Sequence, residues 1–278
     1  MILGMARFCL LVVLSGATAV AALSQLPVRD QSTLPTRRSL LRGAPAAIAT
    51  ASGLTSRKAL AADDLVQIYF GVGCFWHVQH EFVEAERRIL GRSDGELTAR
   101  AGYAGGRKAG KDASRPGQAL VCYHNLARIA DYGKLGHSEV VGLSVPAASV
   151  GAFAKEYAKL FDERGDRPDK GDKGGEYRSL IGLPGGFRDS PLLSAINDAV
   201  KAKGLTLAKG NGDDSDTLGL AKVWVYDTAD FPFYQAEVYH QFHDGFMKGE
   251  QYGKAYNDLR MRAYNAGRLG DTGCPDIA

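Results

Sequence analysis

At 278 residues the chain is long enough for one large domain or two small ones. Its formal net charge is +3, but the first 62 residues hold seven of the 34 basic residues and one of the 31 acidic ones, so the remainder carries about −3. The basic balance therefore gives no reason to expect nucleic-acid binding. Beyond residue 62 the sequence has no internal repeat, no long low-complexity tract and no apolar run of bilayer length, which excludes repeat arrays and a membrane-spanning mature protein.

Residues 1–62 have the layout of a targeting leader. Arg7 precedes an apolar run, residues 8–23, that ends among alanines like a secretory signal; an uncleaved anchor is the alternative, although the run is short for one. Residues 24–35 are similar to an organelle transit peptide, and the pair Arg37-Arg38 precedes an Ala-x-Ala cleavage pattern at residues 59–61. This layout predicts a plastid protein that enters through the secretory pathway, with the thylakoid lumen as a candidate destination and a mature N-terminus near residue 62.

Residues 65–73 (LVQIYFGVG) are predicted to form a short buried strand, because they are rich in β-branched and aromatic residues and close on glycines. Apolar residues then recur at the period of one helix face: Phe75, Val78, Phe82, Ala85 and Ile89. Cys74 thus lies at a strand-to-helix turn, where unpaired N–H groups and the helix dipole favour a thiolate over a thiol. From position alone, a buried cysteine among core aromatics explains the stretch equally well.

The rest of the chain alternates further strands and helices. Strands are predicted at residues 96–104, 135–145 and 177–183, and helices at residues 149–161 and from Ser190-Pro191 to about residue 204, while residues 223–226 are a short apolar piece. This order predicts an α+β domain of two layers, residues 63–252, with helices on one face of an antiparallel or mixed sheet. Residues 253–278 are predicted to form a coil-rich C-terminal arm.

Five short motifs are spread over residues 65–245. They are Gly73-Cys74-Phe75-Trp76, Gly102-Tyr103-Ala104-Gly105-Gly106, Gly136-His137-Ser138-Glu139-Val140, Tyr177-Arg178-Ser179, and Phe233-Tyr234-Gln235-Ala236-Glu237 followed by Tyr239-His240-Gln241. In this order they resemble the motifs of the A-type peptide-methionine sulfoxide reductases, which reduce the S-epimer of methionine sulfoxide. The resemblance implies a ferredoxin-like sandwich for the α+β domain.

The resemblance also implies a thiol chemistry. Cys74 would attack the sulfoxide sulfur and end as a sulfenic acid. Glu139 would donate the proton that the oxygen needs, because a partly desolvated carboxyl has a raised pKa. Tyr177 would hydrogen-bond the sulfoxide oxygen, and Asp172 would hold water or the substrate backbone.

Other motif residues surround these four. Phe75 and Trp76 would contact the substrate methyl group, and His137 is expected to be a hydrogen-bonded structural histidine. Residues expected to support the site from behind are Glu237, Tyr239 and His240. No Cys-x-x-Cys or His-x-x-x-His pair accompanies the histidines, so neither a metal nor a bound cofactor is expected.

Turnover needs a second thiol to reduce the sulfenic acid. Cys9 lies in the leader, and Cys122 matches a position where family members often carry a cysteine that is not catalytic. Cys274 lies in a glycine-rich tail that could bring it onto Cys74. These features favour a Cys74–Cys274 disulfide reduced by a thioredoxin-like partner, with a small-molecule thiol as the alternative.

The chain departs from the family pattern at two places. His77 replaces the usual glycine and adds a titratable ring near Cys74. Gln118 replaces a second oxygen-binding tyrosine, for which Tyr123 or Tyr132 of the apparent insertion at residues 123–134 could substitute. These departures bear on substrate range and rate more than on the class of reaction.

The sequence therefore predicts a monomeric repair enzyme acting on oxidised proteins or peptides. Two rival functions remain open. A thiol peroxidase or redox sensor would use the same cysteine, although it would favour an arginine beside the thiolate. A non-catalytic binder of oxidised methionine is conceivable because of the changes at His77 and Gln118.

Overall fold

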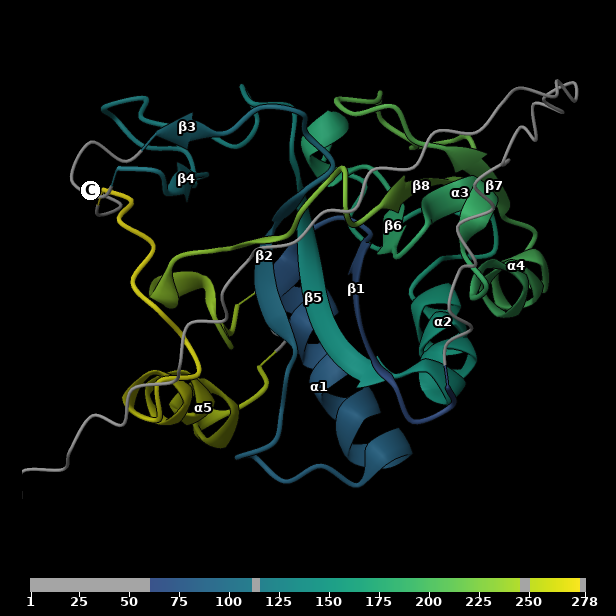
Figure 1. Ribbon diagram of the computed structural model, residues 1–278, viewed down its shortest axis with the longest axis horizontal. Helices are drawn as coiled ribbons and strands as arrows, with labels where there is room; N and C mark the ends of the chain where they lie inside the picture. The colour runs from purple at the N-terminus through teal and green to yellow at the C-terminus, as the bar shows by residue number, and fades with distance from the viewer. Residues whose placement is uncertain (1–60, 112–115, 246–250, 276–278) are drawn as a thin grey trace, which may run out of the picture. The chain divides into compact units, whose positions relative to one another are not determined.

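The computed structural model describes residues 61–111, 116–245 and 251–275 (Figure 1). Within them the chain forms a mixed α/β domain with one seven-stranded sheet and a separate two-stranded ladder. The strands are β1 (Leu65–Gly71), β2 (Arg100–Ala104), β3 (Gly110–Lys111), β4 (Ala119–Leu120), β5 (Ser138–Pro146), β6 (Leu180–Leu183), β7 (Thr206–Lys209), β8 (Lys222–Asp227) and β9 (Tyr234–Gln235). The helices are α1 (Phe75–Leu90), α2 (Val150–Lys159), α3 (Gly186–Asp189), α4 (Leu193–Lys201) and α5 (Lys254–Asn265), with short 3-10 helices η1 (Ala147–Ser149), η2 (Gly175–Tyr177) and η3 (Val238–His240).

The large sheet has the order β7-β8-β6-β1-β5-β2-β9. β1 is antiparallel to β5 and β6, and β2 is antiparallel to β5 and β9. β8 is parallel to β6 and β7. The predicted mixed sheet is confirmed, and it is wider than the sequence indicated. β7 and β9 were not expected, because four and two residues are too few to show a strand period.

The main core lies between the sheet and the helices. Residues 66, 68 and 70 of β1 face this core, while Tyr69 faces the other side of the sheet, as the two-residue period of a strand requires. Phe82 of α1 stacks on Phe70 with 4.9 Å between ring centroids. The predicted apolar face of α1 is confirmed, and Gly91 ends the helix in the left-handed conformation.

Aromatic rings lie directly on glycines at the opposite face of the sheet. Tyr69 covers Gly182, and Phe233 covers Gly102 and Gly142. A Cβ on Gly142 would lie 2.9 Å from the Phe233 ring, so a larger residue there would have to lift the ring off the sheet. These glycines therefore serve close packing.

The prediction of a coil-rich arm after residue 252 is wrong for its first half. Helix α5 occupies residues 254–265 and buries Tyr256, Leu259 and Ala263 along one side. The many polar residues between these three dilute the helical period, which is why the pattern was missed. The predicted leader, except its last two residues, lies outside the described part of the chain. None of the helices in the described residues has the length and apolar character needed to cross a membrane.

Candidate active site

Cys74 lies between the end of β1 and the first residue of α1, at the N-cap position. Gly73, whose φ is +80°, makes the turn, and its N–H donates to the backbone carbonyl of Tyr177 at 3.2 Å. The predicted placement of Cys74 at a strand-to-helix turn is confirmed. A left-handed φ at residue 73 explains the glycine, because other residues rarely adopt it.

Two carboxyl groups occupy the start of α1. The N–H of Cys74 donates to Asp172 Oδ2 at 3.2 Å, and the N–H of Phe75 donates to Glu139 Oε2 at 2.9 Å. Glu139 projects from β5 and is 2% exposed, and its Oε1 accepts from the Tyr132 hydroxyl at 3.2 Å. Amides that begin a helix have no partner within it, so the two acids satisfy donors that would otherwise be orphaned. The Glu139 carboxyl thereby contacts the backbone amide of the residue that follows Cys74, at the start of the same helix.

Burial controls the protonation of both groups. The pKa of Glu139 is raised to about 8, chiefly by burial. The hydrogen bonds from Phe75 and Tyr132 lower it in part, and the charge on Asp172 adds to the rise. Burial also raises the pKa of the Cys74 thiol, with the negative charge on Glu139 as the next cause, and the N–H of Trp76 lowers it only in part. The expectation of a thiolate at the helix start is therefore wrong for the resting site. The helix N–H groups do act on the sulfur, but desolvation outweighs them.

Tyrosine hydroxyls surround the Glu139 carboxyl. Burial, followed by the charge on Glu139, raises the pKa of Tyr123, Tyr132 and Tyr177, so all three hydroxyls stay protonated. Gln118 is exposed and lies beside Tyr234 and Gly270 instead. Of the two substitutes considered from the sequence, Tyr132 is the one that hydrogen-bonds Glu139.

Aromatic residues wall the site on the α1 side. Phe75 is buried against the rings of Tyr103 and His240, at centroid distances of 5.9 and 5.2 Å. Trp76 is partly exposed, stacks on His243 at 3.9 Å, and donates from Nε1 to His240 Nδ1 at 3.3 Å. Burial, with His243 nearby, lowers the pKa of His240 to about 3, so its ring is neutral and able to accept this bond.

The residues expected to support the site do so unequally. Glu237 accepts from the Tyr103 hydroxyl and from the Tyr123 N–H, both at 2.8 Å, and so ties β2 to the segment after Cys122. Tyr239 is half exposed and packs near Trp76 and His240.

Two further histidines lie on either side of the site. His137 accepts from the Gly106 N–H at 3.1 Å and bonds the Lys108 carbonyl at 2.7 Å, so both of its ring nitrogens have hydrogen-bond partners. His77 bonds the Tyr252 hydroxyl through its ring, and it acts on the pKa of Cys74 through its backbone N–H. The sequence predicts that this ring lies near the Cys74 sulfur, whereas the hydrogen bond of the ring is with Tyr252.

Two buried arginines, which sequence reasoning did not single out as site residues, fix the loops of the site. Arg167 donates to the carbonyls of Asp172 and Tyr177, each at 2.8 Å, and pairs with Asp216 through Nη2. Arg178 donates to the carbonyls of Gly105, Gly136 and Gly175. Both side chains are 1% exposed. Tyr-Arg-Ser was recognised as a motif, but only a fold shows that its arginine joins three loops.

The cysteine pairing differs from the expected one. Cys274 forms a disulfide with Cys122, and Cys74 has a free thiol. The predicted Cys74–Cys274 linkage is therefore not the one in this structure. The tail is held against β9 by reciprocal bonds between Gln235 and the backbone of Gly270, which lead Cys274 to Cys122. Within the described residues, one group has three metal-ligating atoms within 4.8 Å of one another, Cys122, Glu237 and Cys274, and its two sulfurs are joined in the disulfide.

Comparisons with known proteins give a consistent result. No family model matches the chain. Peptide methionine sulfoxide reductase MsrA of Pseudomonas aeruginosa (strain LESB58) is 32% identical over 220 residues, covering 78% of this chain and 85% of that protein. The protein of the same name from Rhodospirillum centenum is 29% identical over 177 residues, covering 62% and 64%. The solved methionine sulfoxide reductase A of Corynebacterium diphtheriae aligns at 18% identity over 64% of this chain and 72% of that one, with a TM-score of 0.36, which is too low to carry an argument.

The burial of Glu139 predicts a pH dependence of stability. Its pKa of about 8 in the folded chain compares with an ordinary value of 4.5, so the folded state holds the proton more tightly. The stabilisation is complete below about pH 4.5 and is lost as the pH rises through about 8. Across this range the free energy of unfolding should fall by up to about 4 kcal/mol relative to Glu139→Gln, which cannot ionise.

Urea unfolding of both proteins at about pH 5 and about pH 9 checks this dependence. Glu139→Gln is the control for the wild type, because the two proteins share every other titrating group. A stability difference between the two proteins that stays constant with pH would contradict the raised pKa of Glu139.

Proposed function

Since the chain belongs to the peptide methionine sulfoxide reductase A family, we propose that its Cys74–Glu139 pair reduces the S-epimer of peptidyl methionine sulfoxide. The chain is an oxidoreductase that reduces methionine sulfoxide. The observation that carries the assignment of residues is the helix start, where the Phe75 N–H holds Glu139 next to Cys74 and the Cys74 N–H holds Asp172. A buried carboxyl that keeps its proton near neutral pH can donate that proton as a general acid while the neighbouring nucleophile attacks.

The proposed first step transfers an oxygen from substrate to thiol. The Cys74 sulfur bonds the sulfoxide sulfur, the oxygen takes the Glu139 proton, and the thiol proton returns to the Glu139 carboxylate. Collapse of this adduct gives methionine and a Cys74 sulfenic acid, so the substrate sulfur is reduced by two electrons and Cys74 is oxidised by two. Tyr177 offers a protonated hydroxyl toward the oxygen, because burial and the charge on Glu139 raise its pKa, while the Tyr132 hydroxyl donates to Glu139.

Substrate contacts follow from the exposure of the aromatic wall. Trp76 is partly exposed, so its ring can receive the methyl group, whereas Phe75 is buried against Tyr103 and His240. Asp172 is half-buried, and its side chain is already held by the Cys74 N–H. We assign it to positioning the substrate backbone or a water.

The proposed second step regenerates Cys74 through the other two cysteines. The Cys274 thiol attacks the Cys74 sulfenic acid, a Cys74–Cys274 disulfide forms, and water leaves. The Cys122 thiol then attacks Cys274, which releases the Cys74 thiol and leaves Cys122–Cys274, the bond present in this structure.

Two observations support this route. Tyr123, directly after Cys122, packs on His240 with 4.3 Å between ring centroids, and His240 packs on Phe75, the residue after Cys74, at 5.2 Å. Cys274 itself lines a cavity of about 710 Å³ with Glu237 and Tyr239, which gives an external dithiol such as thioredoxin access to the disulfide.

A raised thiol pKa argues against the rival functions. A thiol peroxidase or redox sensor depends on a thiolate at rest, and burial raises the pKa of Cys74 instead. A non-catalytic binder would have no use for a protonated acid beside that thiol.

Single-turnover assays of the cysteine variants test the proposed route. Cys74→Ser should release no methionine. Cys274→Ser should release one equivalent and stall with thioredoxin, while Cys122→Ser should also release one equivalent and accumulate a Cys74–Cys274 linkage on peptide mapping. Glu139→Gln should slow the first step about 100-fold or more.

Dithiothreitol, which reduces the sulfenic acid directly, is the control that should rescue turnover in the Cys274 and Cys122 variants but not in Cys74→Ser. Full thioredoxin-driven turnover in Cys122→Ser would show that this cysteine is dispensable. Reduction of the R-epimer of methionine sulfoxide at the same rate as the S-epimer would refute the stereochemical assignment.

The finer fold class and the cellular location also belong to this proposal. Four central strands, in the order β6-β1-β5-β2 with α1 and α2 between them in sequence, support a ferredoxin-like core widened by β7, β8 and β9. Residues 1–62 are proposed to direct the chain into a plastid, with the lumen as a candidate destination, because their charge and apolar runs fit a leader.

Mass spectrometry of the native protein should find its N-terminus near Ala62 or Asp63. The expectation follows from the Ala-x-Ala pattern at residues 59–61. A purified native protein that still carries residues before Arg37 would refute the two-step import.

A further inference from the structure

A second cavity lies on the sheet face that carries Tyr69 and Phe233. It encloses about 600 Å³, and Cys74, Glu139 and Tyr177 are not among its lining residues. The ring of Phe233, resting on Gly142, forms part of its floor. Pro232, next to Phe233 in the chain, adds a further apolar part. A volume of this size is ordinary for a small-molecule site, which typically has about 300–1,000 Å³.

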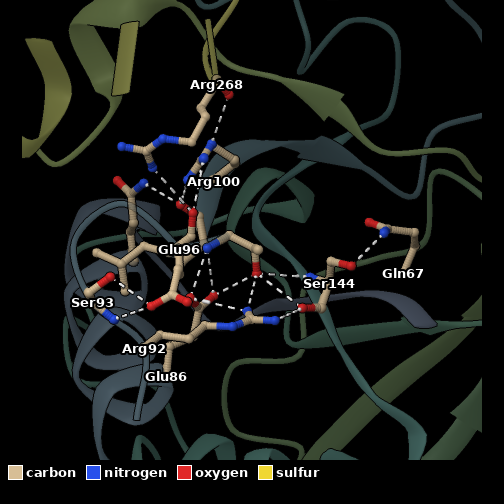
Figure 2. A network of polar contacts seen from close by, with 12 residues as sticks. Gln67, Glu86, Arg92, Ser93, Glu96, Arg100, Ser144 and Arg268 are labelled. Carbon is tan, nitrogen blue, oxygen red and sulfur yellow. Dashed lines mark hydrogen bonds and ion pairs between the residues drawn. The ribbon is translucent and has the colours of Figure 1, made fainter. Parts of the chain in front are cut away.

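Two of the lining residues are arginines, Arg100 and Arg268, and Figure 2 shows them close to each other. Arg100, at the start of β2, donates to the carbonyls of Arg268, Ala99 and Leu97 at 3.2, 2.9 and 3.1 Å. Arg268, in the tail after α5, donates to the Leu97 carbonyl at 3.5 Å. A guanidinium has five N–H groups, so Arg100 has one further N–H on each terminal nitrogen.

No acid of the described residues forms an ion pair with either arginine of this pair, although the charge on Glu86 acts on Arg100 and opposes the lowering of its pKa. Arg92 in the same network, by contrast, pairs with the buried Glu86 at 3.3 Å. Burial, followed by the charge of Arg268, lowers the pKa of Arg100 to about 10, which shows how closely the two charges interact. Glu96, which also lines the cavity, accepts instead from the N–H and hydroxyl of Ser93 at 2.9 and 2.6 Å.

We propose that this cavity binds a small amphipathic anion, with its carboxylate or sulfonate on Arg100 and Arg268 and its apolar body against Phe233 and Pro232. Arginine binds such headgroups through paired N–H donors, and neighbouring like charges gain from an anion placed between them. The apolar floor sets the second requirement, because a bare inorganic anion would leave it unoccupied.

Two fluorescent probes of similar shape separate these requirements. 8-Anilinonaphthalene-1-sulfonate is the anion, and N-phenyl-1-naphthylamine is a neutral compound with the same ring system. Arg268→Gln should weaken binding of the sulfonate about tenfold, the usual worth of one charge-assisted hydrogen bond, and should leave binding of the neutral probe unchanged. Decanoate should displace the sulfonate probe more effectively than decanol does.

Arg262→Gln is the matched control. Arg262 lies on α5, is 58% exposed, pairs with Asp94 at 3.1 Å and is not among the lining residues. This variant removes the same charge and should leave both affinities unchanged. Methionine sulfoxide reduction should persist in both variants, because neither arginine lies at the Cys74 site, and it reports that each variant is folded.

Three results would overturn the proposal. One is equal sulfonate affinity in Arg268→Gln and the wild type. Another is an equal loss in Arg262→Gln, which would indicate a long-range charge effect. The third is an equal loss of both probes in Arg268→Gln, which would assign the arginine to the shape of the cavity and not to anion recognition.

Discussion

The hydrogen bond from the Phe75 amide to Glu139 joins the start of α1 to strand β5, and the chemistry of the site depends on it. A carboxyl at 2% exposure needs partners, and it has two, the Phe75 N–H and the Tyr132 hydroxyl. Both partners lower the pKa of Glu139, yet burial raises it more. The net result is an acid that keeps its proton near neutral pH and is bound to the amide of the residue after the nucleophile. Burial likewise raises the pKa of the Cys74 thiol, so both the thiol and the acid are neutral at rest.

Geometry of this kind requires rigid loops, and two buried arginines supply the rigidity. Arg167 binds the backbone of Asp172 and Tyr177, and Arg178 binds the backbone of three glycines on separate loops. Each guanidinium has several donors in a fixed plane, so one side chain can fix several carbonyls at once. The cost of burying each charge is offset by Asp216 for Arg167, and by backbone carbonyls and the Tyr226 hydroxyl for Arg178.

Local features of the site could be predicted from the sequence, and long-range ones could not. The apolar period after Phe75 fixes α1, and the glycines before it place Cys74 at the turn, because both signals act over a few residues. Partners of Arg167 and Arg178 are backbone carbonyls up to about 70 residues away, as for Gly105, and no sequence pattern records them. The thiolate prediction failed for a related reason, since the helix start is visible in the sequence and the burial of Cys74 is not. The path of the tail past β9 likewise decides that Cys274 meets Cys122.

The protonation of Glu139 is the point on which this account depends most. Difference infrared spectra, wild type minus Glu139→Gln, isolate the carboxylic acid band of this one side chain as the pH is raised. The band should persist through neutral pH and disappear with a midpoint of about 8. A midpoint near the ordinary value of 4.5 would contradict the account, because Glu139 would then have no proton to give the sulfoxide oxygen at neutral pH.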